Sequence, residues 1–289
     1  MADIALNDFL KLYSTPAKTE NPAVADRNAL RRINSQAGAA FPLIRTRGVL
    51  TTIIKAEKDG DFHFYVETER SQNQPDIPMA TCEIQGLAAP GDEKDPRIPR
   101  FKQLASEAVE LAGIFRCWPE HLRDSTQPHL FEIHPVLTIG RVGEEPIDFF
   151  DRVIWPTGED KDEPSRTFSR AFGPPPQLAV KRQGHRIVFA TPSHGMKKEN
   201  YIHVDAFRIG EVVQQGDWAI ATTAEKPNGK NPVQCFALQG TPAFDDFRAM
   251  QNDVRYRIGG LCGLNIPALL QPSPAWQAQF CPILSVEQI

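Results

Sequence analysis

The sequence predicts a mainly β protein built from two tandem five-stranded barrels, and two observations lead to this prediction. The stretch GDFHFYVETE at 60–69 recurs as GDWAIATTAE at 216–225, and the matched blocks around it keep the same order in both halves. Chance similarity would not preserve that order. In each half, five strand patterns and one helical pattern follow as β-β-β-α-β-β, which is the element order of the OB-fold, a small Greek-key barrel.

The strands are predicted from period-two alternation and from β-branched and aromatic residues. In the first copy they lie at 44–56, 61–69, 80–87, 109–118 and 130–139, with a helix at 99–107. In the second copy they lie at 201–211, 217–224, 232–238, 255–261 and 280–286, with a helix at 243–252. When Gly113 is aligned with Gly259, equivalent residues of the fourth strand are predicted to point into the barrel in one copy and out of it in the other. A bulge in one copy would resolve this conflict.

Two further segments complete the predicted organisation. We expect a helical N-terminal arm at 1–40, a first OB-fold domain at 41–142, an insertion at 143–198 and a second OB-fold domain at 199–289. The arm should form two short helices, the second from Ala25 to Gln36, and pack on a domain or on a neighbouring subunit. The insertion is too long for a simple linker. Gln183-Gly184 predicts a hairpin in it, with strands that bridge the two barrels or widen the second.

The composition is that of an ordinary globular protein, with 41% hydrophobic and 24% charged residues in 289. A net charge of −4 gives no overall attraction to phosphate, so a nucleic-acid site would have to be a local basic patch. The sequence has no apolar run near the roughly 18 residues of a membrane helix and no signal-peptide pattern, so we expect a cytoplasmic protein. The five scattered cysteines predict buried free thiols.

Two motifs carry a resemblance to a known group. DGDFH at 59–63 and FEIHPVLTI at 131–139 resemble OB-fold domains of uncharacterised bacterial proteins, which carry a similar DGD-x-H hairpin and a terminal E-[IL]-H-P-V strand. The resemblance covers about 45–139. The second copy has Ala219 in place of His63 and Cys281 in place of His134, so the pattern applies to the first domain. It implies the OB-fold and no established activity.

Alternation along the first two strands of the first copy directs one set of side chains away from the barrel. If Phe62, Phe64 and Val66 fill the barrel, cationic and aromatic residues face outward on the surface with which OB-folds commonly bind oligonucleotides. Nearby glutamates weigh against this role. The candidate nucleic-acid-binding residues are Arg45, Arg47, His63 and Tyr65, with the loop lysines Lys197, Lys198, Lys226 and Lys230 flanking the equivalent strands of the second copy.

The equivalent outward positions of the second copy are Ala219, Ala221 and Thr223. These side chains are too small to stack on a base, and their flatness suits burial against another surface. We therefore expect the second barrel to contact another protein, or the insertion, through these three residues.

Neither a metal nor a catalytic site is predicted. His63, His129 and His134 share a domain with acidic residues, but their spacing matches no compact ligand motif, and Glu132 and His134 would share one face without a close third ligand. Asp59-Gly60-Asp61 is similar to the acidic hairpin of staphylococcal-type nucleases, yet no matching set of acids and arginines accompanies it. Phosphate-loop, dinucleotide, serine-hydrolase and zinc-protease motifs do not occur.

These observations predict a non-enzymatic protein without cofactors that binds single-stranded nucleic acid on the first barrel, with little sequence preference. The alternative is an assembly subunit whose barrels bind only other proteins, or further copies of this chain. The acidic net charge favours the alternative, whereas Arg45, Arg47, His63 and Tyr65 favour nucleic acid.

Overall fold

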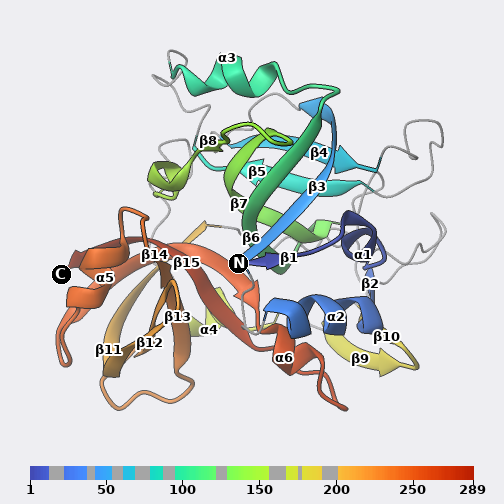
Figure 1. Ribbon diagram of the computed structural model, residues 1–289. Coiled ribbons are helices and arrows are strands. Elements are labelled where there is room, and N and C mark those ends of the chain that lie inside the picture. The colour runs from blue at the N-terminus through green and yellow to red at the C-terminus, as the bar shows by residue number, and fades with distance from the viewer. Residues whose placement is uncertain are drawn as a thin grey trace.

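The computed structural model describes residues 1–12, 23–37, 43–53, 61–68, 79–86, 95–121, 129–155, 167–174, 178–190 and 201–289. Strands dominate these residues, which confirms the predicted mainly β fold. They form a seven-stranded sheet, a closed five-stranded barrel and a small three-stranded sheet. The seven-stranded sheet and the barrel pack against each other, and the small sheet lies beside both of them with α2 (Arg27–Ala37) (Figure 1).

We call residues 43–141 the first repeat. Its strands pair in the order β3-β4-β5-β7-β6, and β6 pairs in turn with β3, so the pairings return to the starting strand. A short parallel strand, β1, extends β3, and β8 pairs with β7. The element bounds are β1 (Ala2–Asp3), β3 (Leu43–Ile53), β4 (Phe62–Glu67), β5 (Ala80–Ile84), α3 (Arg97–Lys102), β6 (Ala108–His121), β7 (His129–Arg141) and β8 (Ile147–Asp148).

We call residues 201–288 the second repeat. Its strands form a closed barrel in the corresponding order, β11-β12-β13-β15-β14, with a parallel pairing between the third and fifth strands, as in the first repeat. The element bounds are β11 (Tyr201–Gln215), β12 (Trp218–Ala224), β13 (Val233–Leu238), α5 (Phe244–Ala249), β14 (Arg255–Leu264), α6 (Ile266–Leu269) and β15 (Ala278–Gln288).

The two repeats correspond pair by pair in their last two strands. Gly113 pairs with Val136 in the first repeat, and Gly260 pairs with Ile283 in the second, with irregular register on both sides of each glycine. The counterpart of Gly113 is therefore Gly260 and not Gly259. Both copies bend at the same place, so the conflict in the fourth strand came from the alignment, and no difference in bulges is needed to explain it.

The same shift applies to the second strand. Phe62 pairs with Ile84 in the first repeat, and Ala219 pairs with Ala237 in the second. The pairings of the neighbouring strands agree with this correspondence, so the counterpart of Phe62 is Ala219. The ten-residue echo in the sequence is therefore out of register by one residue, and a one-residue slip reverses the facing of every side chain in a strand.

This slip makes the prediction for Ala219, Ala221 and Thr223 wrong. Their relative exposures are 0%, 2% and 0%, and the two alanines belong to the main core cluster. Thr223 contacts Cys235 at 3.2 Å inside the barrel. These three residues are therefore part of the protein's own core and form no exposed surface for a partner.

The predicted core of the first repeat is confirmed. Phe62, Phe64 and Val66 are buried, and the rings of Phe62 and Phe64 meet Phe101 of α3 edge to face, with centroids 5.9 and 5.2 Å apart. Such contacts between aromatic rings add to the free energy gained by burying their area. The helix between the third and fourth strands thus closes one end of the aromatic core.

The N-terminal segment packs on the first repeat, in agreement with the prediction. α1 (Leu6–Leu10) buries Leu6, Phe9 and Leu10, and the Phe9 ring lies edge to face with Phe115 at 5.5 Å. α2 begins at Arg27. The residues before it form strand β2 (Ala23–Asp26), where the sequence pattern had indicated a helix from Ala25.

The insertion contains the predicted hairpin, formed by β9 (Ala179–Gln183) and β10 (Arg186–Ala190). Its strands neither bridge the repeats nor widen the second one. Instead, β10 pairs with β2, which gives the separate three-stranded sheet β2-β10-β9. The insertion also holds the short helices η2 (Phe150–Arg152) and α4 (Phe168–Phe172). None of the helices in the described ranges combines the length and the apolar character that crossing a membrane would require.

Candidate functional site

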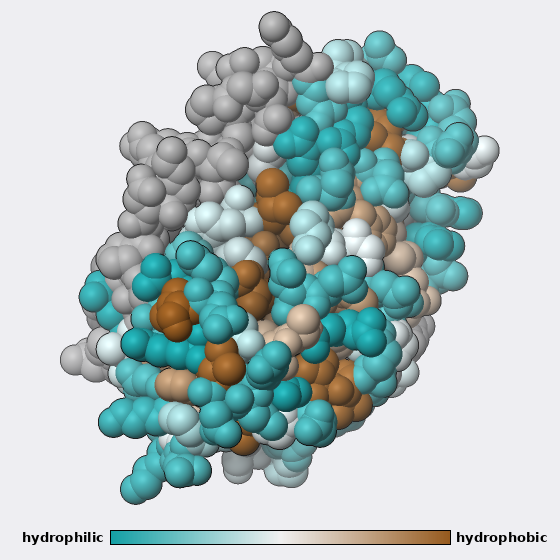
Figure 2. Space-filling view, turned by 90° about the vertical axis from the view of Figure 1, so that its left-hand side faces the viewer, coloured by the Kyte–Doolittle hydropathy of each residue, from teal (hydrophilic) through white to brown (hydrophobic). Residues whose placement is uncertain are grey.

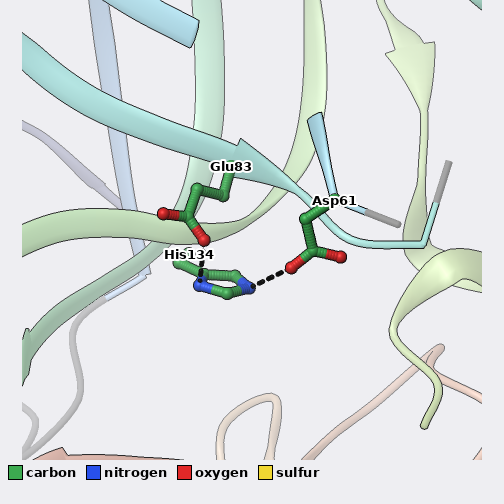
Figure 3. Close-up of side chains that lie close together, drawn as sticks. All are labelled: Asp61, Glu83 and His134. Carbon is green, nitrogen blue, oxygen red and sulfur yellow. Dashed lines mark ion pairs between the residues drawn. The ribbon is translucent and has the colours of Figure 1, made fainter. Parts of the chain in front are cut away.

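A buried cluster of charged side chains lies where the first repeat faces the second. Asp61 precedes β4, Glu83 lies in β5 and His134 lies in β7, and these strands are neighbours in the sheet. Glu83 follows Cys82, which pairs with Ile133, so the register brings Glu83 beside His134. Figure 3 shows the two carboxylates on opposite sides of the His134 ring.

Both ring nitrogens of His134 face an acid. Nδ1 lies 2.8 Å from Glu83 Oε2, and Nε2 lies 3.4 Å from Asp61 Oδ2. Tyr201 of the second repeat covers this group: its hydroxyl donates a hydrogen bond to Asp61 Oδ2 and lies 3.3 Å from His134 Nε2. The other oxygen of Asp61 accepts the backbone N–H of Gly86 at 2.7 Å. His134 and Asp61 have no solvent exposure.

Arg116 extends the cluster toward the second repeat. Its Nη1 donates to Glu132, and its Nε donates to the carbonyl oxygen of Cys262 at 2.5 Å. Arg116 is completely buried, so its charge depends on these two acceptors. The cluster therefore joins the two repeats through at least two residues, Tyr201 and Arg116.

The two acids on the ring keep His134 protonated. Burial by itself would lower the pKa of His134, but the charge of Glu83 and hydrogen bonds to Asp61 and Glu132 outweigh it, so the pKa lies well above its ordinary value. For Glu83 the effects have the opposite sign. Burial by itself would raise its pKa, but the charges of His63 and His134 hold that pKa well below the usual range. At neutral pH the cluster therefore holds paired charges.

His63 marks the edge of the cluster. Its Nδ1 lies 3.4 Å from Glu83 Oε1, and its side chain is 13% exposed. The prediction placed His63 on an open binding face. In the structure its imidazole is largely covered and faces an acid, so it offers little of its surface to a base or a phosphate.

The donor set also bears on metal binding. One atom each of Asp61, Glu83 and His134 lies within 4.8 Å of the others. The expectation that His134 has no further ligand close by was therefore wrong. The two acids lie on opposite ring nitrogens, however, and an ion bound to one nitrogen cannot also bind the acid on the other side. The 2.8 Å separation of Glu83 Oε2 and His134 Nδ1 is that of a close ion pair. The arrangement fits a proton-sharing ion cluster better than a metal site.

Arg45 and Arg47 lie on the exposed side of β3, as predicted. Their side chains are 47% and 68% exposed, and both pair with Glu110, Arg47 Nε at 2.6 Å and Arg45 Nε at 3.8 Å. Arg45 also lies 3.8 Å from Asp3. An open groove of about 820 Å³ runs along these residues, between β3 and the start of the chain, and Thr46, Gly48, Thr68 and Val142 also line it.

The structure separates these arginines from His63 and Tyr65. Tyr65 pairs with Thr52, five residues along β3 from Arg47, which corresponds to about 16 Å at ~3.3 Å per residue. The four predicted residues therefore do not form one compact platform. Of the predicted lysines, Lys226 and Lys230 are exposed between β12 and β13, and Lys197 and Lys198 lie outside the described residues.

The corresponding surface of the second repeat is closed. By strand pairing, His203 is the counterpart of Arg45, and the ring of Trp155 stacks on His203 at 3.5 Å. The counterparts of Arg47 and Glu110 are Asp205 and Arg257, which form an ion pair of reversed sign at 3.1 Å. An open groove with two exposed arginines is thus a feature of the first repeat.

Two general features complete the description. All five cysteines are buried and free, as predicted, and burial raises the pKa of the Cys235 thiol to about 12, so this thiol is poorly reactive. The face of the molecule in Figure 2 is mostly hydrophilic, with hydrophobic residues in small separate patches. Among the residues coloured on this face, no large apolar patch is visible.

Comparisons with known proteins give little further guidance. No protein-family model matches the sequence, and no curated protein matches it significantly. A crystal structure of the p204 HINb domain aligns with 84% of this chain and 95% of that domain, at 9% sequence identity and a TM-score of 0.25. A likeness of this size supports neither a shared fold nor a shared function.

Proposed function

We propose that this chain is a tandem OB-fold protein that binds single-stranded nucleic acid in the groove along β3. The observation that carries the proposal is the pair of exposed arginines, Arg45 and Arg47, in an open groove of about 820 Å³. The strand order shared by both repeats, with its parallel pairing of third and fifth strands, supports the OB assignment.

The expected contacts are to phosphates. A guanidinium group binds phosphate through two parallel hydrogen bonds, and Arg45 and Arg47 are exposed enough to turn from Glu110 toward a ligand. Contacts to the phosphates of a nucleic acid carry no sequence information, so binding should show little sequence preference. Because these contacts are ionic, binding should weaken as the salt concentration rises. Glu110 would compete with each phosphate for the arginines.

We further infer that the protein is not an enzyme and acts in the cytoplasm. The inference about catalysis is supported by the burial of the His134 cluster, since neither His134 nor Asp61 is accessible to a substrate. Catalytic acids and bases must reach the reacting group.

The test is fluorescence anisotropy of a labelled oligothymidine titrated with protein at several salt concentrations. Arg45→Ala/Arg47→Ala should weaken binding at low salt at least about tenfold and flatten the salt dependence. Glu110→Gln should strengthen binding, because it removes the competing carboxylate. The matched control is Arg255→Ala/Arg257→Ala, which removes two arginines that share one carboxylate, Asp205, in the second repeat.

The control should bind like the wild type. No binding by the wild-type protein at low salt would overturn the proposal, and so would equal losses in the two double variants, because they would show that only total charge matters.

A second candidate function is assembly with another protein through the same groove. The observation that favours it is the charge balance of the groove, where Asp3 and Glu110 offset Arg45 and Arg47, next to the exposed Val142. If this function is correct, Glu110→Gln should leave oligonucleotide binding absent or unchanged, and the Arg45→Ala/Arg47→Ala variant should lose a protein partner in a pull-down.

A further inference from the structure

Four arginines gather where the small sheet meets α2. Arg27 and Arg31 lie one turn apart at the start of α2, and Arg182 and Arg186 flank the turn of the β9–β10 hairpin. The backbone N–H of Arg27 donates to the carbonyl oxygen of His185 at 2.8 Å, which fixes the start of the helix against the hairpin turn. We call these four residues the arginine cluster.

The charges of this cluster are poorly balanced. Asp26 pairs with Arg186 across the sheet, but its carboxylate accepts the N–H of Ala29 at 2.8 Å as the cap of α2, and no ion pair joins it to the four arginines in the described part of the chain. Burial, together with the charges of Arg31 and Arg182, lowers the pKa of Arg27. Among the residues that the structure describes, the cluster therefore holds four guanidinium groups against one carboxylate.

Two buried donors of the cluster lack an acceptor in the described part of the chain. Arg27 is 8% exposed, and its Nη2 donates to the carbonyl oxygen of Leu270. The Nε atoms of Arg27 and Arg186 have no hydrogen-bond partner among the described residues. Buried charged donors are costly when unpaired and mutual repulsion adds to that cost, so an anion bound here would relieve both.

The position of the cluster indicates which anion it would bind. Leu270 follows α6, the segment between the fourth and fifth strands of the second repeat, and α2 packs beside α6 (Figure 1). In OB-folds the loop between the fourth and fifth strands is one of those that hold oligonucleotides. The N-terminal segment that lines the groove also leads toward this region, since Asp8 of α1 pairs with Arg32 of α2 at 3.5 Å.

We propose that the arginine cluster is a second phosphate-binding surface, which holds the backbone of the same single-stranded nucleic acid beyond the groove of the first repeat. This inference rests on the proposed function, although a different set of residues carries it. The exposed members, Arg31 and Arg182, would form ion pairs with phosphates, and the buried Arg27 would hold them in place from behind.

The test compares salt dependence in three proteins: the wild type, Arg31→Gln/Arg182→Gln, and the control Arg255→Gln/Arg257→Gln. The probe is a labelled 40-nucleotide oligothymidine. Loss of two phosphate contacts should reduce the magnitude of the slope of log K against log salt by about 1.4, because each contact to a single strand contributes ~0.7. The control should keep the wild-type slope. Both altered side chains of the test variant are exposed, so folding should be preserved, as circular dichroism would verify.

The outcomes separate the two proposals. Binding by the wild type that is lost in Arg45→Ala/Arg47→Ala, with an unchanged slope in Arg31→Gln/Arg182→Gln, overturns this inference and leaves the proposed function standing. No binding by the wild type overturns both. A small-anion site would appear as a rise in melting temperature with inorganic phosphate that the Arg31→Gln/Arg182→Gln variant loses. If the slope for the oligonucleotide is unchanged, such a rise also counts against the inference.

Discussion

The two repeats place opposite chemistry at equivalent positions. Strand pairing makes Trp218, Phe236 and Cys281 the counterparts of Asp61, Glu83 and His134. In the second repeat these positions form an apolar cluster, which packs against Val153 and Trp155 of the insertion. In the first repeat the same positions carry buried charges. One strand arrangement thus supports both a polar and an apolar contact between the repeats.

The residues that cover these positions differ in the same way. Tyr201 of the second repeat covers Asp61 and His134, and its counterpart in the first repeat, Leu43, belongs to the cluster that contains Trp218 and Phe236. An apolar contact requires mainly matching volume, whereas a buried ion cluster requires that every charge keep its partner. The polar half should therefore tolerate single substitutions less well than the apolar half.

The largest effect should come from breaking the ion cluster at Arg116. Arg116→Met removes the partner of Glu132 and the hydrogen bond to Cys262, and leaves a buried carboxylate with less compensation. We expect a loss of about 3–5 kcal/mol in the free energy of unfolding, measured by urea denaturation. The matched control is Arg141→Met, whose ion pairs lie at the surface and should contribute less than ~1 kcal/mol. Equal losses in the two variants would contradict a structural role for the cluster.

The pH dependence of stability should also distinguish the two halves. The pKa of His134 is raised in the folded state. Its contribution to the free energy of unfolding is therefore complete below the ordinary pKa of about 6.5 and is lost as pH rises above that value. The pKa of Glu83 is lowered, so its contribution is complete above about 4.5 and is lost as pH falls below it. The cluster should therefore stabilise the fold most between these two values.

The measurement is the free energy of unfolding from pH 4 to pH 9. Above about pH 6.5 the wild type should lose up to ~1.4 kcal/mol per pH unit, which corresponds to one proton. The variant Glu83→Leu/His134→Leu gives this position the apolar character of the second repeat and should remove that slope. A slope that persists in the variant would show that other groups produce it.

The sequence predicted the elements well because local patterns determine them. Alternation located all ten strands of the two repeats, and Gln183-Gly184 located the hairpin. The predicted register between the copies was wrong by one residue. The alignment matched GDF to GDW by residue type and ignored which side of the strand each aromatic residue faces. Trp218 lies outside its barrel, toward the insertion, whereas Phe62 lies in the main core. Large aromatic residues occur on either side of such a strand. The residue type alone therefore could not determine whether the side chain points into the barrel or out of it.

The buried cluster was missed for a different reason. Asp61, Glu83 and His134 come from three strands that are neighbours only after the third and fifth strands pair in parallel. A signal was nevertheless present: Glu83 interrupts an apolar strand pattern, and His134 precedes a proline in another one. Charged residues in strands that are otherwise apolar indicate a buried partner, and the predicted strand order would have placed them side by side.

The last prediction compares the two glycines that the corrected register makes equivalent, Gly113 and Gly260. A methyl group at Gly113 would lie 2.6 Å from the Ile133 side chain and 2.7 Å from the carbonyl oxygen of Pro135. At Gly260 the nearest atoms, in Phe280 and Pro282, are 3.0 Å away. Because both contacts are closer at Gly113, Gly113→Ala should cost about 2–3 kcal/mol and Gly260→Ala about 1 kcal/mol in unfolding free energy. Urea denaturation would measure both, and a larger loss at Gly260 would mean that the first repeat is packed more loosely than the second at this bend.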